Sequence, residues 1–344
     1  MKVTLKDIAD RANVSISSVS RALSKSQTTA PIHDQTRSRI IQAARELGYR
    51  RWSNTDDDRQ KTAKKRFALV MHLIKDKYQD PYFSEMMYGI ESELQQHGYA
   101  LDYTFEIQDI FTSDLFASLN KDNLGIICVG PLKSDFLYQL KKQVPSVFSV
   151  GGLLLPEIDC VTIDFKRAAH EIVQHLIQLG HRSISFIGGH SRVGESLEQE
   201  RRFLGFKEAM EANALPLVAN WILDGGYCPT KSYEEMVKIL QSEERPTAVF
   251  TASDKMAYGV YKAIQEAGLS IPEDLSVVSF DNIELAEYMN PGLTTVRVHK
   301  EAMGRIAVKL MLQRMEGILP LHLNILLPTE LIYRDSSREL SQEG

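Results

Sequence analysis

The side chains best suited to recognising another molecule lie within the first 24 residues. Two short stretches of helical periodicity are separated there by a tight turn, which is the layout of a DNA-binding helix-turn-helix. Side chains of the second stretch that point away from its apolar side are Ile16, Ser17, Ser20 and Arg21. A guanidinium can donate two hydrogen bonds to one guanine, which discriminates between bases by about 1–3 kcal/mol. Arg21 is therefore the strongest candidate for recognising sequence in a major groove.

Capping and turn signals explain how these side chains would be positioned. Thr4 followed three residues later by Asp7 resembles a capping box, so the first helix begins near Leu5. Asn13 tolerates the left-handed backbone of a tight turn, which we place at residues 12–14. Ser15 can cap the second helix. We expect that helix to bury one side, formed by Val19, Ala22 and Leu23.

A third amphipathic stretch argues against a simpler interpretation, a helical hairpin whose serines are merely solvated. It ends at Gly48, a helix stop signal, and its apolar stripe consists of Ile40, Ile41, Ala44 and Leu47. Three helices can close a small core, so the pattern predicts a three-helix head.

The charge of the chain is divided unevenly. Residues 1–66 carry a net charge of +8, and the remaining 278 residues carry −13. A basic head can attract phosphate through counterion release, whereas an acidic remainder is repelled by DNA. The alternative is a basic segment that is simply solvated.

Length and composition indicate a multidomain protein. The 344 residues are 43% hydrophobic, which is enough to bury more than one core. No stretch is long enough to span a membrane, and the amino terminus has no signal-peptide h-region, so we expect a cytoplasmic protein. No cofactor motif is present, and the histidines form no credible metal set. The three cysteines form no C-x-x-C pair, which indicates buried thiols at Cys128, Cys160 and Cys228.

From Phe67 onward, short apolar runs alternate with helical stretches. The runs predict strands buried on both faces at residues 67–73, 124–129, 147–150, 184–187, 248–250 and 277–280. Helices are predicted between them, among others at residues 83–97, 168–179, 202–211 and 255–267. This is the pattern of an α/β domain with parallel sheets, which bind ligands beyond the carboxyl ends of their strands. Two repeats of similar size predict two lobes with a cleft.

Short motifs distributed along the chain resemble those of one family in their order. They are Val19-Ser20-Arg21-Ala22-Leu23, Glu46-Leu47-Gly48-Tyr49, Leu179-Gly180-His181-Arg182, Gly205-Phe206, Ser253-Asp254-Lys255-Met256-Ala257 with Gly259, Ser276-Val277-Val278-Ser279-Phe280-Asp281 and Leu293-Thr294-Thr295-Val296. The chain resembles the LacI/GalR family of transcription regulators over nearly its whole length. Its head and the loop at residues 26–34 are similar to those of galactose-operon and β-galactosidase repressors.

The resemblance implies a core like a periplasmic sugar-binding protein, with two lobes joined by three crossings. We expect a DNA-binding head at residues 1–50, a linker at 51–66, the core at 67–336 and a tail at 337–344. Lobe one would comprise about 67–164 and 296–326, and lobe two about 165–295 and 328–336. No heptad repeat follows Arg338, so we expect a homodimer on a pseudo-palindromic operator of double-stranded DNA, with half-sites about one helical turn apart.

The linker departs from the family pattern. Family members usually have a Pro-Asn and an Ala-x-x-Leu stretch there, which folds into a hinge helix and wedges leucines into the minor groove. Residues 51–66 contain no leucine and no proline, and they include three adjacent aspartates. Low hydrophobicity and dense charge favour a disordered tether over a hinge helix. This puts in question the usual operator kink and the usual signalling from core to heads.

By resemblance, Ile16, Ser17 and Arg21 occupy the base-reading positions of the family. Serine is permissive, and Ile16 can offer only an apolar contact, for example to a thymine methyl. Residues expected to bind phosphates and to set the register are Thr4, Ser15, Ser20, Ser24 and Tyr49.

The resemblance also implies an effector site in the cleft. Arg202 and Asp281 match the arginine and aspartate that bind sugar hydroxyls in the family. The other expected contacts are Tyr82, Phe83, Tyr227 and Ser253. An aromatic face with a few hydrogen-bonding groups suits a sugar ring. Without the resemblance, Arg202 could equally be a surface cation and Asp281 a cap of the next turn. Gly188-Gly189-His190 lacks phosphate-loop spacing, so a turn into the cleft is favoured.

Three classes of function remain in view. The leading one is a DNA-binding repressor of a sugar-utilisation operon, whose operator affinity a small sugar changes. A phosphorylated sugar or a purine corepressor could replace the neutral sugar. A solute-binding protein of sugar transport is the second class, which the basic head argues against. An enzyme is third, and no nucleophile–base set supports it.

Overall fold

The computed structural model describes residues 4–16, 18–19, 36, 39–40, 42–44, 47, 65–189 and 196–340. The chain forms two compact units, Met1–Lys65 and Arg66–Gly344. Residues 51–64 lie outside the described part, so the tether stays a prediction. No helix in the described part of the chain is long and apolar enough to cross a membrane.

The first helix of the head, α1 (Leu5–Ala12), begins with the predicted capping box. The Asp7 N–H donates to Thr4 Oγ1 (3.4 Å), and the Thr4 N–H donates to Asp7 Oδ2 (2.7 Å). Asn13 ends the helix with a left-handed backbone (φ 50°). Beyond this turn, the Ser18 N–H donates to Ser15 Oγ (3.1 Å). Both caps and the turn are therefore confirmed.

The described part of the head has a small apolar core. Its buried residues are Ile8, Ala9, Ala12, Val19, Ile40, Ala43 and Ala44. Leu5, Val14 and Leu47 pack against them. Ala22, Leu23 and Ile41, which we also predicted to face this core, lie outside the described residues. Segments far apart in the sequence thus share one core, as a three-helix head requires.

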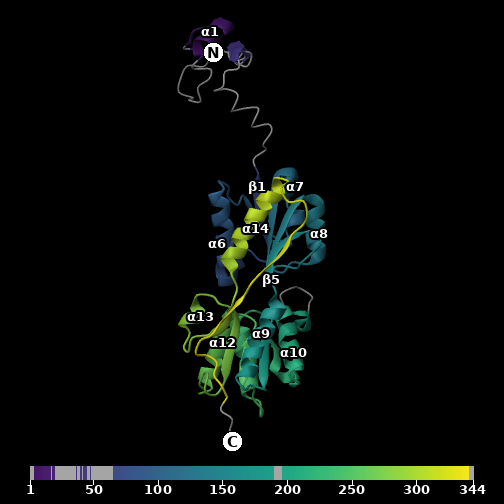
Figure 1. The fold of residues 1–344 in the computed structure, drawn as a ribbon, viewed down its shortest axis with the longest axis vertical. Helices are drawn as coiled ribbons and strands as arrows, with labels where there is room; N and C mark the ends of the chain where they lie inside the picture. Colours follow the sequence, from purple (N-terminus) through teal and green to yellow (C-terminus); the bar gives the residue numbers. More distant parts are fainter. Residues whose placement is uncertain are drawn as a thin grey trace. The chain divides into compact units, whose positions relative to one another are not determined.

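Two six-stranded sheets form the second unit, one in each lobe (Figure 1). The sheet of lobe one is parallel throughout and has the order β11 (Asn324–Leu327), β5 (Asp159–Ile163), β4 (Ser146–Val150), β3 (Leu124–Val129), β1 (Arg66–Met71), β2 (Tyr103–Glu106). The sheet of lobe two has the order β12 (Glu330–Ile332), β10 (Thr294–Arg297), β9 (Ser276–Asp281), β8 (Ala248–Thr251), β6 (Ile184–Gly188), β7 (Ile222–Asp224). Only β12 is antiparallel to its neighbour there. All six predicted strands are present.

Helices cover the sheets of both lobes. Lobe one has α5 (Asp76–Gln79), α6 (Pro81–Gln96), α7 (Asp114–Ser118), α8 (Ser134–Gln143) and α14 (Lys300–Met315). Lobe two has α9 (Phe165–Gln178), α10 (Arg201–Ala212), α11 (Pro229–Leu240), α12 (Asp254–Glu266) and α13 (Leu285–Tyr288). Short 3-10 turns are Ile110–Thr112, Lys121–Asn123, Leu197–Gln199 and Ala219–Trp221. The predicted parallel α/β architecture with two lobes is confirmed.

Three of the predicted boundaries are wrong. Arg66 belongs to β1 rather than to the linker, because it pairs with Leu124 in the sheet and its Nε lies 3.1 Å from Asp102 Oδ1. Val296 and Arg297 belong to lobe two rather than lobe one, because β10 continues through them beside β9. Lobe two also extends beyond residue 336, since the Leu340 N–H donates to Leu179 O (2.8 Å).

The prediction of buried thiols is correct for Cys128 and Cys160 but wrong for Cys228, which is exposed. Cys228 immediately precedes Pro229, the first residue of α11. It therefore lies in a loop at the carboxyl end of β7 rather than inside an element, which explains its exposure.

Candidate functional site

Arg202 lies at the centre of a polar cluster beside the carboxyl end of β9. It is the second residue of α10, and only 8% of it is exposed. Its guanidinium carbon lies 4.6 Å from the ring centre of Phe165 and 4.8 Å from that of Phe280. Both rings thus hold the guanidinium by cation–π contacts. The alternative that Arg202 is a solvated surface cation is wrong.

Glu200 fixes the position of this arginine. Its Oε1 accepts a hydrogen bond from Arg202 Nη1 (2.9 Å), and its Oε2 accepts from the backbone N–H groups of Arg202 (2.8 Å) and Phe203 (2.9 Å). One carboxylate therefore caps α10 and orients the guanidinium. We did not predict Glu200. Its only signal was an acidic residue two positions before the predicted start of the helix at residue 202.

Tyr227 joins the same cluster from the loop after β7. Its hydroxyl accepts from Arg202 Nη1 (2.8 Å) and lies 3.3 Å from Glu200 Oε1. Burial raises the pKa of the Tyr227 phenol well above its ordinary value, so the hydroxyl stays neutral. Gly189 leaves room for the ring, because a Cβ there would lie 2.7 Å from a Tyr227 ring carbon. Gly189, the residue after β6, therefore lies beside the cluster.

Asp281 ends β9 with a left-handed backbone (φ 111°) and is 4% exposed. Its Oδ1 lies 3.9 Å from Arg202 Nη2 and has no hydrogen-bond donor in the described part of the chain. Burial raises the pKa of Asp281, and the Arg202 charge opposes that rise. The next turn is capped by a different carboxylate, since the Ile283 N–H donates to Asp254 Oδ2 (2.8 Å). Asp281 is thus an unpaired acceptor beside Arg202.

Lobe one contributes Tyr82, the second residue of α6. Burial, and next the charge of Asp281, raise the pKa of the Tyr82 phenol, so this side chain lies within electrostatic range of Asp281. Phe83 packs edge-to-face against Tyr82, with ring centres 5.2 Å apart. The Phe83 ring also lies beside Gly130, where a Cβ would be 3.1 Å from it. Phe83 therefore supports Tyr82 within lobe one.

Several buried polar atoms around this cluster have no partner. Ser253 lies directly before α12 and is 6% exposed, and its hydroxyl makes no hydrogen bond in the described structure. The same holds for Arg202 Nε, Tyr258 OH and Asp281 Oδ1. Buried polar groups in proteins are almost always hydrogen-bonded, so a group of unpaired ones indicates where a polar ligand or water binds. We define the cleft site as Tyr82, Arg202, Tyr227, Ser253, Tyr258 and Asp281.

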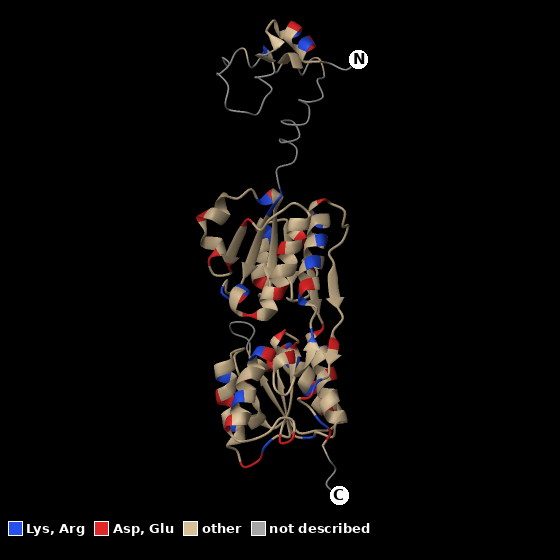
Figure 2. Ribbon diagram, turned by 90° about the vertical axis from the view of Figure 1, so that its left-hand side faces the viewer, with Lys and Arg blue, Asp and Glu red and all other residues tan. Residues whose placement is uncertain are grey.

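One ion pair joins the two lobes beside the cleft site, and a second lies within lobe one at the same edge. Lys255 Nζ of α12 lies 3.3 Å from Asp80 Oδ2, and Lys300 Nζ of α14 lies 3.2 Å from Glu85 Oε2. Figure 2 shows charged residues gathered where the two lobes meet.

Burial, followed by the charges of Asp254 and Asp80, raises the pKa of Tyr258 to about 12. Tyr258 therefore lies near groups of both lobes.

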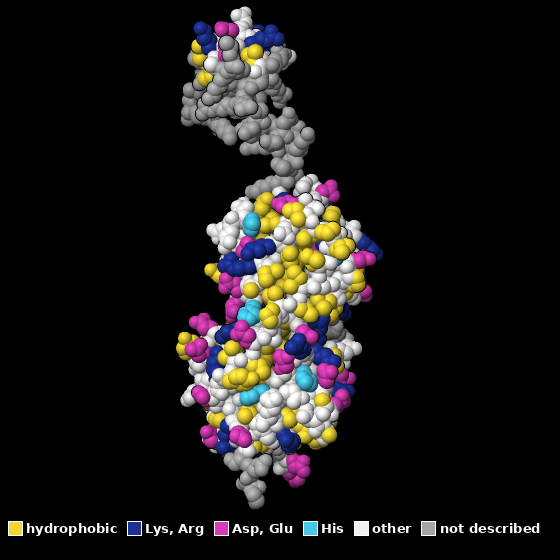
Figure 3. All heavy atoms as spheres, viewed as in Figure 1, with side chains coloured by type: hydrophobic (Ala, Val, Ile, Leu, Met, Phe, Trp, Pro, Cys, Tyr) yellow, Lys and Arg dark blue, Asp and Glu magenta, His cyan; other side chains and the backbone are white. Residues whose placement is uncertain are grey.

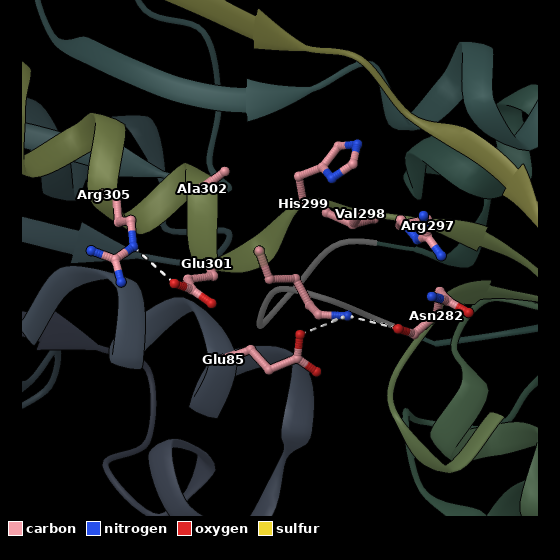
Figure 4. A pocket seen from close by; sticks show the side chains of 9 residues that line it. Glu85, Asn282, Arg297, Val298, His299, Glu301, Ala302 and Arg305 are labelled. Atoms are coloured by element: carbon pink, nitrogen blue, oxygen red, sulfur yellow. Dashed lines mark hydrogen bonds and ion pairs between the residues drawn. The ribbon is translucent and has the colours of Figure 1, made fainter. Parts of the chain in front are cut away.

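A separate pocket lies at the crossing between β10 and α14 (Figure 4). It is lined by Glu85, Asn282, Arg297, Val298, His299, Lys300, Glu301, Ala302 and Arg305. Its cations already have carboxylate partners: Arg297 with Glu330 (2.9 Å), Lys300 with Glu85 (3.2 Å) and Arg305 with Glu301 (2.8 Å). It shares no residue with the cleft site, and none of the unpaired atoms of the cleft site lines it.

In the head, the structure describes three of the expected DNA contacts. Thr4 Oγ1 lies 2.7 Å from Asp7 Oδ2, and Ser15 Oγ lies 2.9 Å from Ser18 Oγ, so both hydroxyls are engaged in caps. Ile16 is 48% exposed and thus available for an apolar contact. The other expected contacts lie outside the described residues: Ser17, Ser20, Arg21, Ser24 and Tyr49.

Two family models match the chain. "Bacterial regulatory proteins, lacI family" matches residues 4–51, and "Periplasmic binding protein-like domain" matches residues 173–337. The first covers the capped helices of the head, and the second covers most of lobe two and the last strands of both sheets.

Characterised proteins match over almost the full length. The HTH-type transcriptional repressor MelR of Bacillus subtilis (strain 168) is 34% identical over 97% of each chain. Catabolite control protein A of Priestia megaterium is 30% identical over 98% of this chain and 100% of its own. A solved structure described as the transcriptional regulator CelR–cellobiose complex has a TM-score of 0.70 and 25% identity, and covers 97% of this chain and 100% of its own.

Proposed function

Because the chain belongs to the lacI family of bacterial regulatory proteins, we propose that it is a repressor whose operator affinity changes when a neutral sugar binds in the cleft site. Family membership makes it a DNA-binding transcriptional regulator with an effector-binding core rather than an enzyme. The proposal adds the class of effector and the residues that hold it.

The unpaired polar atoms of the cleft site are the observation that carries this proposal. Arg202 Nε is a donor, Asp281 Oδ1 is an acceptor, and the hydroxyls of Ser253 and Tyr258 can be either. A sugar presents hydroxyl groups that both donate and accept, so its chemistry matches both kinds of atom. Tyr82 supplies an aromatic side chain from the opposite lobe.

The charges favour a neutral sugar over a phosphorylated one. Arg202 is balanced by Glu200 (2.9 Å) and Asp281 (3.9 Å), and Lys255 is balanced by Asp80 (3.3 Å). A phosphate group would bring further negative charge beside these carboxylates without meeting a free cation among the described cleft residues. A purine is disfavoured because the Phe165 and Phe280 rings are already stacked with Arg202.

Among neutral sugars we favour galactosides, since the head and the loop at residues 26–34 are similar to those of galactose-operon and β-galactosidase repressors. The matched relatives include a repressor named MelR and a regulator solved with cellobiose, so glycosides of two monosaccharide units belong in any test. We further propose that the protein acts in the cytoplasm, where its operator lies.

We also propose that the protein binds DNA as a homodimer. Large hydrophobic side chains are exposed on two elements on the same side of the core in Figure 1, Tyr88 of α6 (60% exposed) and Leu285 and Tyr288 of α13 (54% and 72%). A surface of this kind is typical of an association site. Hydrophobic side chains also gather over lobe one on the face drawn in Figure 3, and exposed ones after α14 are Ile318, Leu321 and Leu326.

We expect the full-length protein to bind one neutral sugar by calorimetric titration, and to bind its 6-phosphate at least tenfold more weakly. The phosphate would lie beside the carboxylates of the cleft site without a free cation. The panel would contain galactose, melibiose, lactose, cellobiose and ribose, their available phosphates, and hypoxanthine. Tighter binding of a phosphate, or binding of hypoxanthine alone, would contradict the assignment.

A further inference from the structure

Lys300 connects the effector-binding turn of lobe two with lobe one. It is the first residue of α14 and is 2% exposed. Its Nζ donates to the carbonyl oxygens of Asp281 (2.7 Å) and Asn282 (3.1 Å), and lies 3.2 Å from Glu85 Oε2. An ammonium group has three donors, so each of them has a partner here. Two partners lie at the end of β9 and directly after it, and one lies on α6.

The turn that Lys300 holds has an unfavourable backbone. Asp281 and Asn282 have successive positive φ angles of 111° and 47°. Left-handed conformations are costly for residues other than glycine and persist where the surroundings hold them. On the N–H side, the Asn282 N–H donates to Thr295 Oγ1 (3.4 Å) and the Ile283 N–H to Asp254 Oδ2 (2.8 Å). The carbonyl oxygens of Asp281 and Asn282 accept hydrogen bonds from the ammonium group of Lys300, which belongs to lobe one.

Asp281 therefore has one partner for its side chain and another for its backbone. Its carboxylate lies in the cleft site beside Arg202, and its carbonyl is bound by Lys300. A movement of α6 and α14 relative to lobe two would pull on this carbonyl and shift the carboxylate. The chain leads from the head directly into β1 of lobe one. A movement of lobe one would therefore reach the head through this connection before a movement of lobe two would.

We propose that Lys300 is a positioning residue that holds Asp281 for the effector and, through Glu85, couples effector binding to the arrangement of the lobes. This rests on the proposed function of the cleft site. Loss of the ammonium would remove the charged donor from both carbonyls and from the Glu85 carboxylate, and would leave the Asp281 carbonyl with the longer bond from the Val298 N–H (3.4 Å), so the turn would loosen.

Hydrogen exchange of the sugar-free, full-length protein tests the positioning role without any ligand. In Lys300→Met, we expect amide exchange in peptides covering residues 281–284 to rise at least tenfold. Lys309→Met is the matched control, because Lys309 lies on the same helix with its side chain 56% exposed. Its exchange in that turn should equal that of wild type. Circular dichroism would confirm that both variants fold. Equal protection of the turn in Lys300→Met and wild type would overturn the proposal.

A second variant separates positioning from coupling. Glu85→Gln removes the charged contact on lobe one and leaves the Lys300 bonds to the two carbonyls in place. With galactose as the probe, we expect its Kd to rise at least tenfold in Lys300→Met. In Glu85→Gln the Kd should stay within about twofold, while the effect of galactose on operator binding shrinks. A galactose Kd in Lys300→Met equal to that of wild type would overturn the proposal. If wild type does not bind galactose, the sugar assignment fails, and the exchange result still decides the role of Lys300.

Discussion

Replacing Arg21 with alanine is expected to weaken binding to the protein's own operator by about 5- to 150-fold, while binding to random DNA changes little. This range corresponds to the 1–3 kcal/mol that a bidentate contact between arginine and guanine contributes. Arg21 lies outside the described residues, so the assignment rests on the helix-turn-helix pattern and on the family motif. The other base-reading candidates, Ile16 and Ser17, have no charged donor.

The measurement is a gel-shift titration of wild type and variants on operator and on scrambled DNA at one salt concentration. Arg21→Lys is the matched control, because it keeps the charge but lacks the planar pair of donors. We expect it to keep non-specific binding and to lose most of the specificity. An Arg21→Ala variant that binds the operator as tightly as wild type would refute this role.

Replacing Arg202 with alanine is expected to raise the sugar concentration for half-maximal response on the order of 100-fold, with operator binding unchanged when sugar is absent. In the proposed site the guanidinium would donate charged hydrogen bonds to the sugar, each worth about 1.5–3 kcal/mol. The change also leaves Glu200 and Asp281 buried without their cation, which we expect to lower the free energy of unfolding by about 3–5 kcal/mol.

Because Arg202→Ala is also expected to lower the stability of the fold, Arg202→Lys provides a second test of the role of Arg202 in the sugar response. It retains the positive charge between the two carboxylates and loses the planar fork, so it should fold normally and still respond poorly. Lys207→Ala on the exposed side of α10 is the control for substitution in this helix, and its dose curve should match wild type. Dose curves of both Arg202 variants that coincide with wild type would remove Arg202 from the site.

Local signals predicted much of this fold. The capping box at Thr4, the left-handed Asn13 and the serine cap at Ser15 depend on neighbouring residues alone, and the structure has all three. The six predicted strands are the buried ones with continuous apolar runs. The strands that we did not predict are short or contain polar residues. For example, β5 contains Asp159 and Thr162, and β7 is three residues long and only partly buried.

The expected residues of the cleft site came from the family resemblance, together with the position of Asp281 at the end of a predicted strand. Arg202, Asp281 and Tyr227 meet in the structure as the resemblance implied. Glu200 and Lys300 were not predicted, because an acidic residue before a helix is a weak signal and because Lys300 binds backbone carbonyls, which carry no side-chain identity. Glu200 acts through the orientation of Arg202, and Lys300 reaches Glu85 more than two hundred positions away. The boundary at Arg297 depends likewise on which sheet β10 joins.

The central claim, that a sugar in the cleft site changes operator affinity, is tested most directly by fluorescence anisotropy. Wild-type protein would be titrated onto labelled DNA from its own promoter at fixed salt, with and without each sugar of the panel. We predict that one neutral sugar shifts the operator Kd by about 5- to 150-fold, which corresponds to a coupling free energy of 1–3 kcal/mol. Salt-dependent binding that no sugar alters would contradict the account.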